Sequence, residues 1–219
     1  MAKLIKYTSE NGLKAEFLLE KWIGRGAYGE VFICSVLNAD PELGFPATVA
    51  CKKVTARYEG EFEEMKEREI KVWSISEGKN IIRLYAAVII DTDMYFFFHF
   101  YNGGMLSDLI KAKGKLEEKL AARIIEQLLR GLIELHKKGY VHRDIKPDNV
   151  ILHFDWMDPN MTVPEDFLKD WDYLKQSCFS SVLADLGKHH FWLMNKMCLV
   201  LYIVYIWAFK INIVSSKIF

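Results

Sequence analysis

A polar stretch from His142 to Asn149, with the sequence HRDIKPDN, carries the side chains of this chain that are best suited to chemistry. The Asp144 carboxylate can orient a hydroxyl group and accept its proton, and the Lys146 ammonium can neutralise charge on a transferring phosphoryl group. The amide oxygen of Asn149 can bind a magnesium ion. These are the parts that phosphoryl transfer needs. The alternative is a polar turn that joins a helix to the apolar run VIL at 150–152.

A glycine cluster at 23–31, with the sequence IGRGAYGEV, is the second candidate site. Its spacing also occurs in dinucleotide-binding turns and in ordinary hairpin loops. Here the third glycine, Gly29, is followed by the strand-like residues EVFI rather than by a helical pattern. This order favours a loop that covers phosphates between two strands, where the missing Cβ lets backbone N–H groups approach closely.

The octet at 142–149 resembles the catalytic loop of the eukaryotic protein kinases, and Lys146 is typical of the serine/threonine type. The resemblance covers about residues 17–188. It implies an α+β, two-lobed protein-kinase-like fold with a small antiparallel sheet, one helix beside it, and an incomplete helical large lobe. It also implies ATP-dependent phosphorylation of serine or threonine on protein substrates, with ATP and Mg²⁺ as cofactors and Asp144, Lys146 and Asn149 as catalytic residues.

The resemblance extends to the nucleotide site. In the run VACK at 49–52, Ala50 would pack on adenine and Lys52 would hold the α- and β-phosphates. The adjacent Lys53 competes for that role, but strand alternation turns it to the opposite face. Glu69, on an amphipathic segment at 61–76, would pair with the lysine. The other nucleotide contacts that the resemblance implies are Ile23, Gly24, Gly26, Gly29, Val31, His99, Tyr101 and Ile151, with Phe98 as a bulky residue behind the adenine.

The resemblance implies two metal ligands, Asn149 and Asp185, the second within the triplet Asp-Leu-Gly at 185–187. The alternative for Asp185 is a simple turn acid. The triplet follows Asn149 at a longer distance than in the family, so we predict an insertion at about 153–180. We expect this insertion, rich in Asp, Trp and Pro, to bulge from a hairpin. An apolar stripe along 116–138 predicts a long helix that supports the octet.

Composition limits the other function classes. The 219 residues carry a formal net charge of +0, which gives no reason to expect a nucleic-acid partner. The four cysteines are scattered, which favours a reducing compartment and disfavours a structural zinc site. The N-terminal sequence lacks a signal-peptide pattern, so we expect the kinase-like region to face the cytosol.

The segment 189–219 departs from the family, since it is apolar and lacks the activation segment and helices expected there. Three interpretations stay open: non-native sequence, single-pass membrane attachment through 197–214, and an unusual packed segment. Its uninterrupted apolar core is shorter than the ~20 residues that cross a bilayer, although flanking lysines could lengthen it. The alternative function is therefore a catalytically inactive nucleotide-binding module, acting as a binding or membrane-tethered regulatory protein. We also expect the 219-residue chain to transfer phosphate to proteins poorly.

Overall fold

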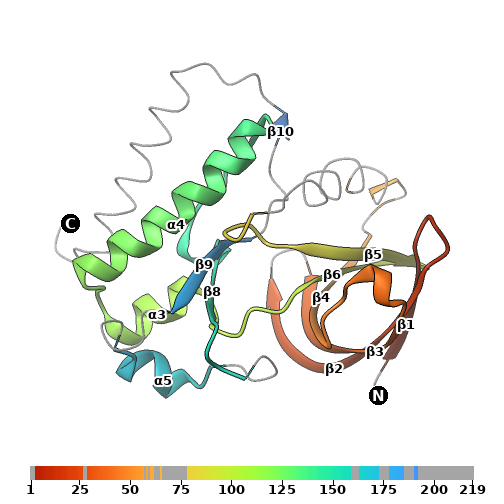
Figure 1. Cartoon of the computed structure of the whole chain (residues 1–219), viewed down its shortest axis with the longest axis horizontal. Coiled ribbons are helices and arrows are strands. Elements are labelled where there is room, and N and C mark those ends of the chain that lie inside the picture. Colours follow the sequence, from red (N-terminus) through yellow and green to blue (C-terminus); the bar gives the residue numbers. More distant parts are fainter. Residues whose placement is uncertain are drawn as a thin grey trace. The chain divides into compact units, whose positions relative to one another are not determined.

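The computed structural model describes residues 3–26, 29–56, 58, 60–61, 65, 78–158, 163–172, 178–184 and 190–191. The chain divides into two compact units (Figure 1). The first contains Met1–Ile75 and Arg83–Phe100, and the second contains Ser76–Ile82 and Tyr101–Phe219. Each unit is described by itself.

The first unit contains a six-stranded antiparallel sheet that curves strongly in Figure 1. The strand order is β1-β2-β3-β4-β6-β5. The short 3₁₀ helix η1 (Pro41–Leu43) lies between β3 and β4. The strands are β1 (Lys3–Thr8), β2 (Lys14–Gly26), β3 (Gly29–Ala39), β4 (Thr48–Thr55), β5 (Leu84–Ile90) and β6 (Asp93–His99).

One face of this sheet carries a buried apolar cluster of the first unit. Phe17 on β2 and Phe97 on β6 are both fully buried, and their rings stack with centroids 3.8 Å apart. Ile5 on β1 is also fully buried in this cluster, so the strand that precedes residue 17 is part of the same core. Cys34 and Cys51 lie there as free thiols. The hydrogen bond with Cys34, together with burial, raises the pKa of the Cys51 thiol, which is therefore a neutral core group.

The second unit is built around α4 (Glu118–Lys137) and a two-stranded hairpin. The predicted helix over 116–138 is confirmed, and its apolar stripe is buried. The chain leaves this helix through Gly139, whose φ of 82° lies in the left-handed region that glycine adopts without strain. The other elements are α3 (Leu106–Lys113), β7 (Tyr140–Val141), η3 (Pro147–Asn149), β8 (Val150–Phe154), α5 (Glu165–Asp170), β9 (Phe179–Leu183) and β10 (His190–Phe191).

Strands β8 and β9 pair in antiparallel register from Val150–Leu183 to Phe154–Phe179, and the connection between them runs over 155–178. The predicted insertion therefore leaves from a hairpin. Its described part packs into the core of the second unit, where Leu168 and Trp171 are buried. The Trp171 ring lies edge-on to Phe154, with centroids 4.9 Å apart. Aromatic residues spaced along the insertion supply the apolar area that holds it there.

Glu69, Asp185 and the segment 192–219 lie outside the described residues. Within the described part of the chain, no helix is long and apolar enough to cross a membrane.

Candidate active site

The polar stretch at 142–149 begins with a buried histidine. His142 is fully buried, and its Nε2–H donates to the backbone oxygen of Ala184 at 2.9 Å. Its Nδ1 accepts the backbone N–H of Asp144 at 3.3 Å. The two contacts require the neutral tautomer with the proton on Nε2. His142 therefore ties the start of the stretch to the residue that follows β9.

Arg143, between these two contacts, has a φ of 64°. This left-handed conformation is uncommon for residues other than glycine and costs about 1–3 kcal/mol. Such strain persists only where the surroundings enforce it. Here His142 is fixed by its bond to Ala184 and also accepts the Asp144 N–H, so the backbone is held on both sides of Arg143.

Asp144, Lys146 and Asn149 are brought together around one carboxylate oxygen. Nδ2 of Asn149 donates to the backbone oxygen of Asp144 at 2.7 Å and to its Oδ2 at 3.1 Å. Nζ of Lys146 lies 3.3 Å from the same Oδ2. Asn149 is only 6% exposed, whereas the Lys146 side chain is 47% exposed. The sequence brings these groups together because Pro147 starts the short helix η3, which turns Asn149 back toward Asp144.

The end of β9 meets this stretch from the other side. The Ala184 N–H donates to the backbone oxygen of Asn149 at 2.9 Å, so Ala184 contacts both His142 and Asn149. Ala184 precedes the predicted metal ligand Asp185, which itself lies outside the described residues. The sequence alone gives no role to His142 or Ala184. For His142, the available signal was its place directly after the apolar Val141, whereas only tertiary pairing reveals the contacts of Ala184.

No group of three or more His, Cys, Asp or Glu side chains able to hold a metal is present among the described residues. The amide oxygen of Asn149 is the ligand that the described part of the predicted magnesium site offers. Amide and carboxylate oxygens suit this hard cation.

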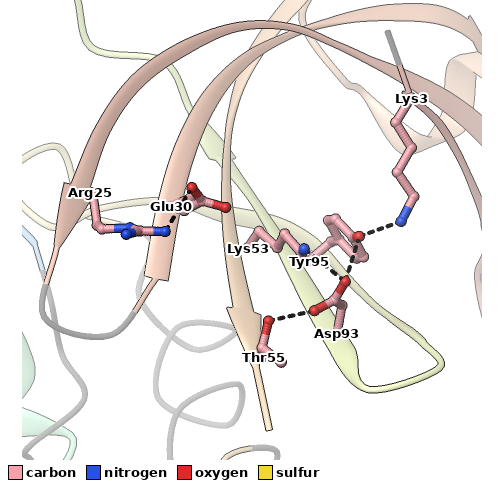
Figure 2. A network of polar contacts seen from close by, with 7 residues as sticks. All are labelled: Lys3, Arg25, Glu30, Lys53, Thr55, Asp93 and Tyr95. Atoms are coloured by element: carbon pink, nitrogen blue, oxygen red, sulfur yellow. Dashed lines mark hydrogen bonds and ion pairs between the residues drawn. The ribbon is translucent and has the colours of Figure 1, made fainter. Parts of the chain in front are cut away.

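The glycine cluster forms the β2–β3 hairpin, with Gly24 opposite Val31 and Gly26 opposite Gly29. This confirms the prediction that a strand follows the third glycine. Gly29 has a φ of 153°, and a Cβ there would lie 2.1 Å from the backbone oxygen of Lys53, so only glycine fits. Arg25 and Glu30 join the two strands through an ion pair of 3.2 Å (Figure 2). Ile23 is 38% exposed on this hairpin.

Strand β4 carries the two candidate lysines. Lys52 lies opposite Val31 on one side and Phe96 on the other, and Ala50 lies opposite Phe98. Residues two apart on a strand share a face, so Ala50 and Lys52 point to one side of the sheet and Lys53 points to the other.

Lys53 is held by a polar network on its own face (Figure 2). Its Nζ lies 2.9 Å from Oδ2 of Asp93, which also accepts the Tyr95 hydroxyl at 3.2 Å. The Thr55 hydroxyl donates to Oδ1 of Asp93 at 2.6 Å. Lys3 on β1 donates to the Tyr95 oxygen at 2.5 Å. The network gives Lys53 a structural role on this face of the sheet, opposite to the face of Lys52.

We expect Asp93→Asn to lower the thermal midpoint at neutral pH but not in acid. Burial alone would raise the pKa of Asp93, but the hydrogen bonds from Thr55 and Lys53 outweigh it and lower the pKa below its usual value. A carboxyl with a depressed folded-state pKa contributes stability above its unfolded pKa of about 3.9, and this is lost as the pH falls through the folded value. Melting curves of both proteins between pH 7 and pH 2 test this. A difference independent of pH would contradict it.

The predicted base contacts at 98–101 fall in both units. In the first unit, the His99 backbone N–H donates to the Arg83 oxygen at 2.9 Å, and its Nδ1 lies 3.0 Å from the Tyr85 hydroxyl. A base contact by His99 would therefore come from its carbonyl oxygen. In the second unit, the Tyr101 ring lies edge-on to His153, with centroids 5.6 Å apart. Ile151 lies on β8, shortly after Asn149 in the sequence, and is half-buried.

A family model described as the protein kinase domain matches residues 17–162. Aurora kinase from Yarrowia lipolytica is 29% identical over 140 residues, which are 64% of this chain and 37% of that protein. Serine/threonine protein kinase OSK3 from Oryza sativa subsp. indica is 36% identical over 124 residues, covering 55% of this chain and 24% of that protein. Aurora kinase from Schizosaccharomyces pombe is 30% identical over 139 residues, which are 64% of this chain and 38% of that protein.

The chain belongs to the protein kinase family. The predicted family and its α+β fold are thereby confirmed, with a sheet-rich first unit and few helices in the second. The relatives named above are serine/threonine kinases or Aurora kinases. The chain matches between 24% and 38% of the length of these relatives.

Proposed function

We propose that this chain binds ATP with Mg²⁺ and directs transfer of the γ-phosphate to serine or threonine hydroxyls of proteins, at a low rate in the 219-residue chain. The observation that carries the proposal is the orientation of the Asp144 carboxylate by Asn149 and Lys146. The family membership of the chain and the names of its relatives support the same reaction class.

Asp144 is the residue that orients the acceptor hydroxyl in this proposal. Asn149 and Lys146 both contact Oδ2 and so hold the carboxylate that would accept the hydroxyl proton. The carboxylate side chain is 20% exposed, which leaves room for an incoming hydroxyl group. The catalytic gain comes from holding that hydroxyl in line with the phosphorus atom, since phosphoryl transfer depends mainly on positioning and on charge stabilisation.

Lys146 and Asn149 have second roles. The partly exposed ammonium of Lys146 can neutralise charge on the transferring phosphoryl group, because its flexible side chain can turn from the Asp144 carboxylate toward that group. The Asn149 amide donates its N–H to Asp144 and can offer its oxygen to Mg²⁺. When bound, Mg²⁺ neutralises charge on the nucleotide phosphates. We propose Asp185 as the second ligand.

The first unit supplies most of the proposed nucleotide contacts, and the second unit supplies Tyr101 and Ile151. Lys52 would hold the α- and β-phosphates and pair with Glu69, and Ala50 would pack on the adenine. The hairpin of β2 and β3 would cover the phosphates with its glycine backbone. Ile23, Val31, His99, Tyr101 and Ile151 complete the proposed set around the base and sugar.

The proposal is tested by the thermal midpoint of the 219-residue chain with and without ATP and Mg²⁺. A ligand that binds only the folded state stabilises it by about 2.7 kcal/mol at a hundred times its dissociation constant, so the midpoint should rise. An unchanged midpoint at millimolar ATP would overturn the proposal. Binding without phosphate transfer to a serine/threonine peptide library would instead support the inactive nucleotide-binding module.

A further inference from the structure

The segment Asn102–Gly104, which follows Tyr101, runs beside β8 as an additional strand-like edge. The Gly103 N–H donates to the Leu152 oxygen at 2.9 Å, and the Leu152 N–H donates to the Gly104 oxygen at 2.9 Å. A Cβ on Gly103 would lie 2.6 Å from the Leu152 backbone, so the two chains approach as closely as glycine permits. All of these contacts lie within the second unit.

Asn102 extends this pairing through its side chain. It is 1% exposed, and its Oδ1 accepts the Phe154 backbone N–H at 2.9 Å while its Nδ2 donates to the Phe154 oxygen at 3.2 Å. The amide group thus replaces the pair of backbone hydrogen bonds that an antiparallel neighbour would supply. A buried amide with both groups engaged in this way fixes the chain on either side of it in one register.

The insertion at 155–178 holds Asn102 from another direction. Its Val163 N–H donates to the backbone oxygen of Asn102 at 2.9 Å. Val163 and Phe167 both pack against the core of the second unit, in which Leu168 and Trp171 are buried. Asn102 is therefore fixed by both β8 and the insertion.

We propose that Asn102 is a positioning residue for the base end of the nucleotide site. This inference rests on the proposed function. Asn102 acts through two residues assigned to the base: Tyr101, which precedes it, and Ile151 on β8. The Tyr101 ring is also held against β8 by His153. Fixing Asn102 against Phe154 sets the register between the Tyr101 backbone and the Ile151 side chain, and so preorganises the base contacts.

The test compares dissociation constants of ATP, ADP and adenosine for wild type and Asn102→Asp. The aspartate keeps the acceptor for the Phe154 N–H, loses the Nδ2 donor and places a carboxylate against a carbonyl oxygen. All three ligands carry the adenine base, so we expect the substitution to lower their affinities by the same factor. That factor should be about fivefold or more, the loss expected when one hydrogen bond is removed. Asn102→Ser, which cannot reach both Phe154 groups, should act in the same direction without adding a charge.

Two controls separate positioning from general destabilisation. Phe179→Leu loosens the same core and should lower the thermal midpoint without changing the three affinities at low temperature. Asn38→Asp removes a comparable amide donor, to Glu16 on the exposed sheet surface, and should leave nucleotide affinity unchanged. Wild-type affinities in both Asn102 variants, or a loss confined to ATP and ADP, would overturn the inference while leaving the proposed function intact. Failure of wild type to bind any of the three would instead reject the proposed function.

Discussion

Asp144→Asn should reduce phosphate transfer from ATP to serine or threonine peptides about 10²- to 10⁴-fold, the usual contribution of a positioned general base. The substitution keeps the size of the side chain, and an amide oxygen can still accept the Asn149 N–H that now meets Oδ2 at 3.1 Å. What is lost is the negative charge that we propose orients the acceptor hydroxyl and takes its proton. ATP affinity should stay near the wild-type value, because the proposed nucleotide contacts are unchanged.

The matched control is Asp148→Asn, an identical change a few residues away at an exposed position. It should leave transfer within a small factor of wild type, since no argument from the site gives Asp148 a chemical role. Initial rates at saturating ATP and peptide measure both variants. Equal losses in the two variants, or full transfer by Asp144→Asn, would remove Asp144 from the mechanism.

Phe17→Ala should lower the free energy of unfolding of the sheet unit by about 3–5 kcal/mol, the range for truncating a buried aromatic residue. Phe17 is fully buried, and it both stacks on Phe97 and contacts Phe45 with ring centroids 5.3 Å apart. Removing the ring leaves a cavity bounded by strands that cannot collapse without breaking the sheet.

Trp22→Ala on the same strand is the control for Phe17→Ala. Trp22 is 55% exposed, so its removal should change stability by less than about 0.5 kcal/mol despite its larger ring. Urea unfolding followed by circular dichroism measures both variants. Similar losses would show that the curved sheet does not bury Phe17 as described.

The local chemistry of this chain could be predicted from its sequence because it depends on short motifs. The grouping of Asp144, Lys146 and Asn149 follows from a few residues and one proline. The strand after Gly29 follows from the apolar residues beside it. Strand alternation predicts that Lys52 and Lys53 face opposite sides of the sheet, and Lys53 pairs with Asp93 on its own side.

The long-range contacts could not be predicted in the same way. Strand β1 lies before the recognised motifs, and only its pairing with β2 shows that Ile5 completes the core. The composition of the insertion suggests a bulge. Leu168 and Trp171 are nevertheless buried in the core of the second unit, because they pack against residues from other parts of the chain. The roles of Asn102 and Ala184 also depend on partners distant in sequence, so no local pattern identifies them.

The most direct test of the kinase-type nucleotide site is the dissociation constant of ATP with Mg²⁺ for wild type, Lys52→Ala and Lys53→Ala. The two variants remove the same side chain from neighbouring positions on β4. Hydrogen bonds to charged groups contribute about 1.5–3 kcal/mol, so Lys52→Ala should weaken binding about 10- to 100-fold. Lys53→Ala should lower stability through the loss of its pair with Asp93 but leave the affinity for ATP within about twofold of wild type. Equal affinities in all three proteins, or a larger loss in Lys53→Ala, would contradict the assignment.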